Sequence, residues 1–188
     1  MALLQRMSEF AYELKIPKER VAVLIGKDGA VKKQIEEHTK TALKIDSAEG
    51  DIFVKGEDPL SLYMTRDIIR AIGRGVNPET ALLLLKPDYM YEVIDISDFA
   101  RKANHLIRLR ERIIGREGRG RKTIEDLTEC RICVYGKTIS IIGENERVSL
   151  ARRAVEALLK GSPHANVYKF LERERRKLHM QKIEERQL

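Results

Sequence analysis

Two segments of the chain repeat one another, and this repeat limits the possible folds more than any other feature of the sequence. LIGKDGAVKKQIEEHT (24–39) and IIGREGRGRKTIEDLT (113–128) align without gaps at an offset of 89 positions. From Ile25 to Thr39, seven of 15 positions are identical to their counterparts, and four more keep their charge. Similarity at a fixed offset is typical of a duplicated structural unit. The chain therefore contains two copies of one module.

The residues around the repeat predict the same elements in both copies. ALKID and DIFVKGE follow the first repeat, CRICVYG and KTISIIGE follow the second, and each reads as a strand. A helix with periodic apolar residues comes next in each copy. EFAYELKIP and MYEVIDIS precede the repeats, each as a strand that runs into a short helix. About nine additional residues within 97–112 of the second copy are expected to lengthen its first helix.

These elements divide the chain into four parts. We expect a first module over 1–76, a linking helix over 77–88, a second module over 89–162 and a helical tail over 163–188. Asn77 and Pro78 are residue types that begin a helix. The tail is predicted to form a helix from about His164 to Arg186, whose imperfect apolar stripe packs its first half on the second module. The residues of this stripe are Val167, Tyr168, Phe170, Leu171, Leu178 and Ile183.

The positive charge of the chain lies entirely in its second half. Residues 1–88 hold 14 basic and 14 acidic residues, whereas 89–188 hold 22 basic and 15 acidic residues. Confinement of the charge to one module indicates a polyanion site, since a protein that neutralises phosphates releases their counterions. A basic face kept for solubility is the alternative.

Composition also restricts the class of protein. The longest aliphatic run, 81–85, is too short to span a bilayer, and no secretory signal is present. With only two cysteines, the sequence predicts a reduced cytoplasmic protein. Abundant Lys, Arg, Glu and Ile with few Asn and Gln fit a thermophile.

Each repeat contains a Gly-x-x-Gly turn between two helices, which is suited to holding a sugar-phosphate backbone. Glycine removes the Cβ atom, so the main chain can approach the phosphates, and the amides at the start of the next helix favour negative charge. Such a turn clamps about four nucleotides of a single strand. We expect these RNA-contact residues: Gly26, Lys27, Asp28, Gly29, Lys32 and Lys33 in the first module, and Gly115, Arg116, Glu117, Gly118, Arg119, Arg121 and Lys122 in the second.

The element order, the Ile-Gly-x-x-Gly turn, the Ile six residues after the second glycine and the Thr ten after it resemble the type I KH domain. The resemblance covers about 8–75 and 89–162. It implies an α+β fold of two tandem modules, each with the order β-α-α-β-β-α and a three-stranded antiparallel sheet with three helices. The alternative is a pair of turns that merely join helices.

A narrower resemblance comes from the second module and its neighbours. RERIIGREGRGRKTIEDLTECRICVYGKTISIIGE, YEVIDISDFARKANHLIRLR, GRGVNPETALLLL and KGSPHANVYKFLERERR look like the archaeal partner-of-Nob family, also called the Dim-two family. The resemblance implies a factor of small-subunit ribosome assembly that binds near the 3′ end of the small-subunit ribosomal RNA, beside the Nob endonuclease and within the pre-ribosomal particle. Eukaryotic members of the family have a degenerate first KH module, whereas Gly26 to Gly29 is intact here.

Three other patterns do not support an enzyme or a metal site. GREGRGRKT (115–123) lacks the Lys that follows the second glycine of a phosphate-binding loop, because Arg121 follows Gly120. Cys130 and Cys133 are predicted to point to opposite faces of a strand, with Cys130 in the core. The acidic pairs Glu36-Glu37 and Glu125-Asp126 are attributed to solvated helix faces.

We therefore predict a non-enzymatic, single-stranded RNA-binding protein without cofactor or metal, whose second module contributes most of the binding. Two alternatives remain. One is a KH accessory subunit of an RNA-degrading exosome, although such subunits usually add an S1-type barrel for which the chain has no room. The other is a protein-interaction scaffold.

Overall fold

The computed structural model describes residues 10–185, and the chain divides between Pro87 and Asp88 into two compact units. Residues 1–9 of the predicted first module and residues 186–188 of the predicted tail lie outside the described residues. No helix within residues 10–185 is both long and apolar enough to cross a membrane.

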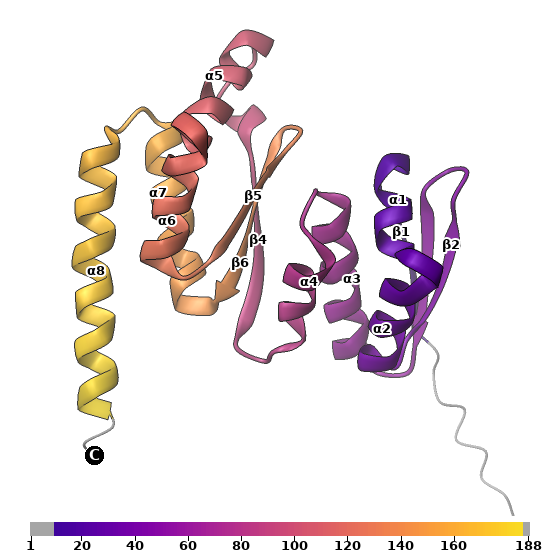
Figure 1. The fold of residues 1–188 in the computed structure, drawn as a ribbon. Coiled ribbons are helices and arrows are strands. Elements are labelled where there is room, and N and C mark those ends of the chain that lie inside the picture. Colours follow the sequence, from indigo (N-terminus) through magenta and orange to yellow (C-terminus); the bar gives the residue numbers. More distant parts are fainter. Residues whose placement is uncertain (1–9, 186–188) are drawn as a thin grey trace, which may run out of the picture. The chain divides into compact units, whose positions relative to one another are not determined.

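The first unit folds in the predicted order, with its helices against one face of an antiparallel sheet (Figure 1). The strand order is β1-β3-β2. Ile52 and Val54 on the central strand are buried, whereas Phe53 between them is exposed, because successive side chains of a strand point to opposite faces. The elements are β1 (Phe10–Lys15), α1 (Lys18–Ile25), the 3-10 turn η1 (Lys27–Gly29), α2 (Ala30–Thr39), β2 (Ala42–Asp46), β3 (Asp51–Gly56) and α3 (Pro59–Gly73).

The linking segment is less regular than predicted. It forms one α-helical turn, α4 (Pro78–Ala81), followed by a 3-10 turn, η2 (Leu82–Leu85). Asn77 precedes the helix as expected, but its side chain makes no capping hydrogen bond to the described backbone. Lys86 is extended, with φ −77° and ψ 134°, because the proline that follows it disfavours helical backbone.

The second unit repeats the fold, with the strand order β4-β6-β5. Its first helix has 12 residues against eight in the first unit, which confirms the predicted lengthening. Part of the additional segment forms the 3-10 turn η3 instead. The elements are β4 (Tyr89–Asp95), η3 (Ile96–Asp98), α5 (Ala103–Ile114), the 3-10 turn η4 (Arg116–Gly118), α6 (Arg119–Thr128), β5 (Arg131–Tyr135), β6 (Thr138–Glu144), α7 (Asn145–Leu159) and α8 (His164–Glu185). The predicted α+β class with three-stranded antiparallel sheets is therefore confirmed.

The core of the second unit lies between its sheet and its helices. Ile139 and Ile141 on β6 pack with Ile132 on β5, Ile113 on α5 and Ile124 on α6 in one buried cluster. Their burial fixes α5 and α6 against the sheet, and these two helices flank the glycine turn.

Helix α8 docks on the second unit through its first half. Val167 and Leu171 belong to the buried core cluster, and Tyr168 and Phe170 are partly buried against it. The predicted docking of this half is therefore confirmed.

Candidate nucleic-acid interface

The two glycine turns have the same backbone conformation. In the second unit, Gly115 has φ +72° and ψ 176°, Glu117 has φ +54° and ψ 28°, and Gly118 has φ +75° and ψ 4°. The corresponding residues of the first unit repeat these angles closely. Among the non-glycine residues, positive φ recurs at equivalent positions, at Glu117 and its counterpart Asp28. The duplication therefore preserves the shape of the turn although its middle residues differ.

The two glycines of each turn have different roles. A Cβ atom on Gly115 would lie 2.6 Å from the backbone nitrogen of Gly120, and one on Gly26 would lie 2.5 Å from Val31 Cγ2. At Gly118 no atom lies within 4 Å of the added Cβ. Open space therefore surrounds the second glycine only, and the close approach of nucleic acid to either glycine remains a prediction. The first glycine is required because the start of the following helix packs against it.

The tip of the second turn presents backbone donors. The Gly118 N–H donates to the Gly115 carbonyl at 3.2 Å, and the Gly115 N–H donates to Glu111 at 2.8 Å. The amides of Arg116 and Glu117 between them make no hydrogen bond to the described part of the chain. Exposed donors at the start of a helix form a site that fits a phosphate group.

The predicted basic residues separate into two groups. Arg116, Arg119 and Lys122 are exposed around the second turn. Arg119 Nη2 lies 2.7 Å from Glu117 Oε2, but both side chains are more than 65% exposed, so the pair stabilises little and Arg119 can turn to a phosphate. Arg121 instead lies along α6 beside Glu125. In the first unit, Lys27 and Lys33 are exposed, while Lys32 lies near Glu36. The contacts of all these residues with RNA remain predictions.

Sequence reasoning missed an arginine that holds the turn-bearing helix in place. Arg112 on α5 donates through Nε to the carbonyl of Leu158 at 3.0 Å and through Nη2 to that of Ser162 at 2.7 Å. These carbonyls belong to the end of α7 and the segment after it. Arg20 on α1 bonds the carbonyls of Ile72 and Val76 in the first unit. The two arginines are not aligned in the repeat, so no sequence signal pointed to them.

The two glutamates of the repeat are not merely solvated. Glu125 Oε1 accepts a hydrogen bond from the Ile132 N–H at 2.7 Å, and Glu36 Oε1 accepts one from the Leu43 N–H at the same distance. The interpretation of these residues as part of a solvated face is therefore wrong, because the N-terminal end of the edge strand lies against α2 or α6. The exposed Asp126 fits that interpretation. The same position of the repeat holds a glutamate in both copies, and this was the sequence signal from which their contact with the edge strand could have been inferred.

The cysteines follow the sequence prediction. Cys130 is 1% exposed and belongs to the core cluster, and burial raises the pKa of its thiol to about 11. Cys133 is half-buried on β5, and neither cysteine takes part in a disulfide bond. Within residues 10–185, no three His, Cys, Asp or Glu side chains come together in an arrangement that could hold a metal ion.

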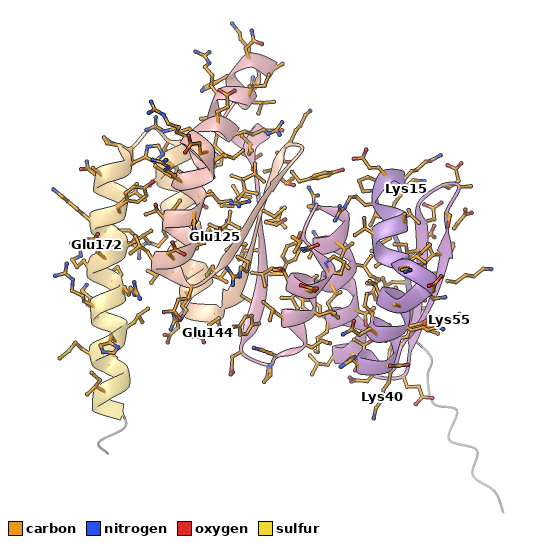
Figure 2. The ribbon with its side chains drawn as sticks, viewed as in Figure 1. Lys15, Lys40, Lys55, Glu125, Glu144 and Glu172 are labelled. Carbon is orange, nitrogen blue, oxygen red and sulfur yellow. The ribbon has the colours of Figure 1, made fainter. Side chains whose placement is uncertain are left out.

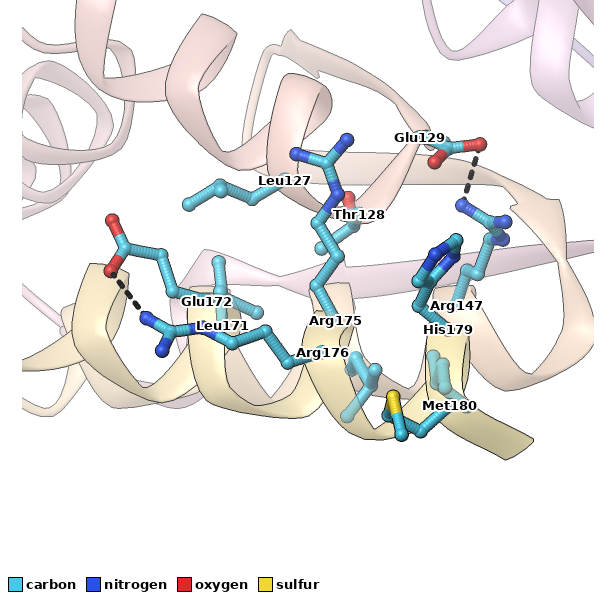
Figure 3. A pocket seen from close by; sticks show the side chains of 12 residues that line it. Leu127, Thr128, Glu129, Arg147, Leu171, Glu172, Arg175, Arg176, His179 and Met180 are labelled. Atoms are coloured by element: carbon cyan, nitrogen blue, oxygen red, sulfur yellow. Dashed lines mark ion pairs between the residues drawn. The ribbon is translucent and has the colours of Figure 1, made fainter. Parts of the chain in front are cut away.

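A groove in the second unit lies apart from the glycine turn of that unit. It has a volume of about 650 Å³ and runs between the end of α6, the start of α7 and the second half of α8. Figure 3 shows Leu127 and Leu171 in it, with the Arg175 side chain extending from α8 to a position between Leu127 and Thr128 and His179 beside Arg147. None of the predicted RNA-contact residues lines this groove.

Two units of this fold, each with a Gly-x-x-Gly turn at the start of its second helix, define a tandem type I KH protein. Residues 11–71 match the KH domain family. Residues 90–176 match the second KH domain of the partner-of-Nob proteins, described as a eukaryotic-type, type I KH domain.

Similarity to individual relatives shows which family of tandem KH proteins the chain belongs to. The chain is 52% identical over 175 residues to a KH domain-containing protein of Methanocaldococcus jannaschii, covering 91% of this chain and 77% of that protein. Its fold is similar to Dim2p from Pyrococcus horikoshii, with a TM-score of 0.82, 46% identity and coverage of 87% of this chain and 99% of that one. The chain belongs to the archaeal partner-of-Nob family, the Dim2 proteins, as the sequence resemblance implied.

Two further solved structures are similar. One is a chain in the crystal structure of an a/eIF2alpha–aDim2p–rRNA complex from Pyrococcus horikoshii, with a TM-score of 0.85, 44% identity and coverage of 92% and 97%. The other is a protein of unknown function from Aeropyrum pernix, with a TM-score of 0.89, 34% identity and coverage of 94% and 96%.

Proposed function

We propose that this protein binds single-stranded ribosomal RNA near the 3′ end of the small-subunit RNA and acts there as an assembly factor of the small ribosomal subunit. The observation that carries the proposal is the second glycine turn. Its Arg116 and Glu117 amides are unbonded within the described chain, and its Gly118 has open space in front of it. KH domains use such a turn to clamp the backbone of about four nucleotides.

The distribution of charge supports a larger contribution from the second module. Arg116, Arg119 and Lys122 surround its turn, and this half of the chain holds the whole net charge of +7. Contacts with phosphates provide affinity that does not depend on sequence. The first module has an intact turn but no excess charge, so we propose that it adds a weaker contact.

The proposed partners follow from the family and its relatives. A Pyrococcus Dim2p forms a complex with ribosomal RNA and the initiation factor subunit eIF2alpha. We propose the same kind of RNA partner here, together with a Nob-family endonuclease and the pre-ribosomal particle, in the cytoplasm. The proposed role is not catalytic, since the protein would hold the RNA for the endonuclease.

Crosslinking of the protein to RNA in its own cells, with the crosslinked nucleotides read by sequencing, tests this proposal. We expect the crosslinks to concentrate near the 3′ end of the small-subunit ribosomal RNA and to fall sharply in a Gly118→Asp variant. Crosslinks spread over messenger or transfer RNA would refute the ribosomal assignment. Crosslinks that do not depend on Gly118 would refute the site.

A protein-docking role is a second candidate, and the groove beside α8 is the observation that favours it. The groove is lined by leucines and basic residues (Figure 3), and none of the predicted RNA-contact residues belongs to its lining. Binding through apolar contacts is expected to change little with salt, whereas RNA binding weakens steeply. The salt dependence of each complex therefore separates the two roles.

A further inference from the structure

A glutamate occupies the open edge of the sheet next to the proposed RNA path. β5 is an edge strand, and the outward-pointing Ile132 N–H is bonded to Glu125 Oε1 at 2.7 Å. Figure 2 labels Glu125 on α6. In an antiparallel pair, alternate residues direct both backbone groups away from the neighbouring strand, so Val134 points its N–H outward as well. At the Ile132 position the edge therefore presents a carboxylate in place of a donor.

This carboxylate has capacity for a further hydrogen bond. Two carboxylate oxygens accept about four hydrogen bonds between them, and the Ile132 N–H uses one. Arg121 Nε lies 3.6 Å from Glu125 Oε2, which is too long for a hydrogen bond. That Nε is buried and has no hydrogen-bond partner among the described residues. The Glu125 side chain remains 14% exposed, so a ligand donor can reach it.

Glu125 lies within reach of a nucleotide held by the glycine turn. Gly118 is at the N-terminus of α6, and Glu125 follows it by seven residues, or about 10 Å along the helix. This is about the distance from a phosphate to the far edge of its own base. A nucleotide whose phosphate rests on the turn can thus place its base against β5 beside Glu125.

The chemistry of this position selects among bases. A free strand N–H would bond to carbonyl oxygens and ring nitrogens, whereas a carboxylate accepts only. Cytosine, adenine and guanine each carry an exocyclic amino group, and carboxylates accept from the amino group of cytosine in nucleic-acid complexes. Uracil has a carbonyl oxygen where cytosine has its amino group, and that oxygen repels a carboxylate.

We infer that Glu125 is a specificity-determining residue, which makes the second module favour a base with an amino group and reject uracil at the position next to the turn. The inference rests on the proposed binding of single-stranded RNA. It adds the residue that reads a base, whereas the glycine turn contacts phosphates only.

The test compares the full-length protein with two variants of equal charge. Glu125→Gln keeps an amide oxygen for the Ile132 N–H but presents an NH₂ group to the ligand, so the preference should shift towards uracil. Asp126→Asn removes the same charge from the neighbouring, exposed position of α6. Each protein is titrated at one salt concentration against short oligo(C) and oligo(U) of equal length, and thermal unfolding confirms that the variants are folded.

We expect wild type and Asp126→Asn to bind oligo(C) about tenfold more tightly than oligo(U). We expect Glu125→Gln to lose or reverse this ratio. A wild-type ratio near one, or a ratio that Glu125→Gln leaves unchanged, overturns the inference while single-stranded RNA binding stands. If the wild type binds neither oligonucleotide nor other single-stranded RNA, the proposed function itself fails.

A second measurement requires no variant, so a folding defect in Glu125→Gln cannot obscure the result. Cytidine is replaced throughout the oligonucleotide by 2-pyrimidinone riboside, which lacks the amino group and adds no bulk. We expect wild-type protein to bind this oligonucleotide more weakly than oligo(C), because the amino group that donates to Glu125 is missing. Binding as tight as that of oligo(C) would show that the amino group is not read, and the inference would be overturned.

Discussion

Replacement of Gly118 by Asp is expected to remove RNA binding and leave the fold intact. The structure has open space within 4 Å of the added Cβ, and the backbone angles of φ +75° and ψ 4° are ones that Asp and Asn adopt more readily than other residues. We expect a loss of about 1 kcal/mol in folding stability from this conformation. Against the RNA, a carboxylate about 4 Å from a phosphate near the surface costs roughly 4 kcal/mol, or about a thousandfold in affinity.

The assay is a titration of labelled single-stranded RNA, with thermal unfolding measured on the same samples. Gly118→Asn has the same shape without the charge, so it is expected to retain more affinity. Gly115→Ala is the opposite control, because its Cβ would lie 2.6 Å from a backbone nitrogen and we expect the unfolding temperature to fall sharply. Undiminished binding by Gly118→Asp would refute the site. An equally large loss of RNA affinity in Gly29→Asp would refute the unequal roles of the two modules.

Three further predictions follow from charge and burial. Removal of residues 1–86 is expected to leave much of the RNA affinity, and an isolated first module that binds RNA equally well would contradict the charge argument. Replacement of three basic residues by Ala is expected to weaken binding to all single-stranded sequences by a similar factor. It is also expected to reduce the slope of log affinity against log salt by roughly two, at about 0.7 per contact. An unchanged slope would place these residues away from the RNA. They are the exposed residues around the second turn, Arg116, Arg119 and Lys122. Burial raises the pKa of Cys130 to about 11 from 9.0, so its contribution to stability is complete below about pH 9 and is lost as the pH rises to 11. Urea unfolding of wild type is therefore expected to lose about 2 to 3 kcal/mol over this range relative to Cys130→Ala, and parallel pH curves would contradict the shift.

The duplicated module and its turn could be predicted from the sequence because both are local. The repeat fixes which helices flank Gly115 to Gly118, and the alternation of apolar residues such as Ile132 and Val134 indicates a strand. The comparisons with known proteins then confirmed the family that these motifs indicated.

Contacts between distant elements could not be predicted in the same way. The bond from Arg112 to Ser162 joins residues 50 positions apart and depends on how α5 crosses the end of α7. The bond from Ile132 to Glu125 depends on the distance from α6 to the edge strand. The different roles of Gly115 and Gly118 could be recognised only from the position of Gly120, and residue spacing in the sequence does not give that position.

The arginine that bonds α5 to the end of α7 couples the glycine turn to the point where the chain leaves the KH fold. In the second unit, Arg112 bonds the backbone where the chain leaves α7, and the ring of His164 at the start of α8 bonds the Arg112 carbonyl at 2.9 Å. Arg20 makes the same kind of tie at the exit of the first unit. The direction in which the chain leaves each unit and the position of its glycine turn are therefore not independent, because the arginine on the helix before the turn bonds the exit segment.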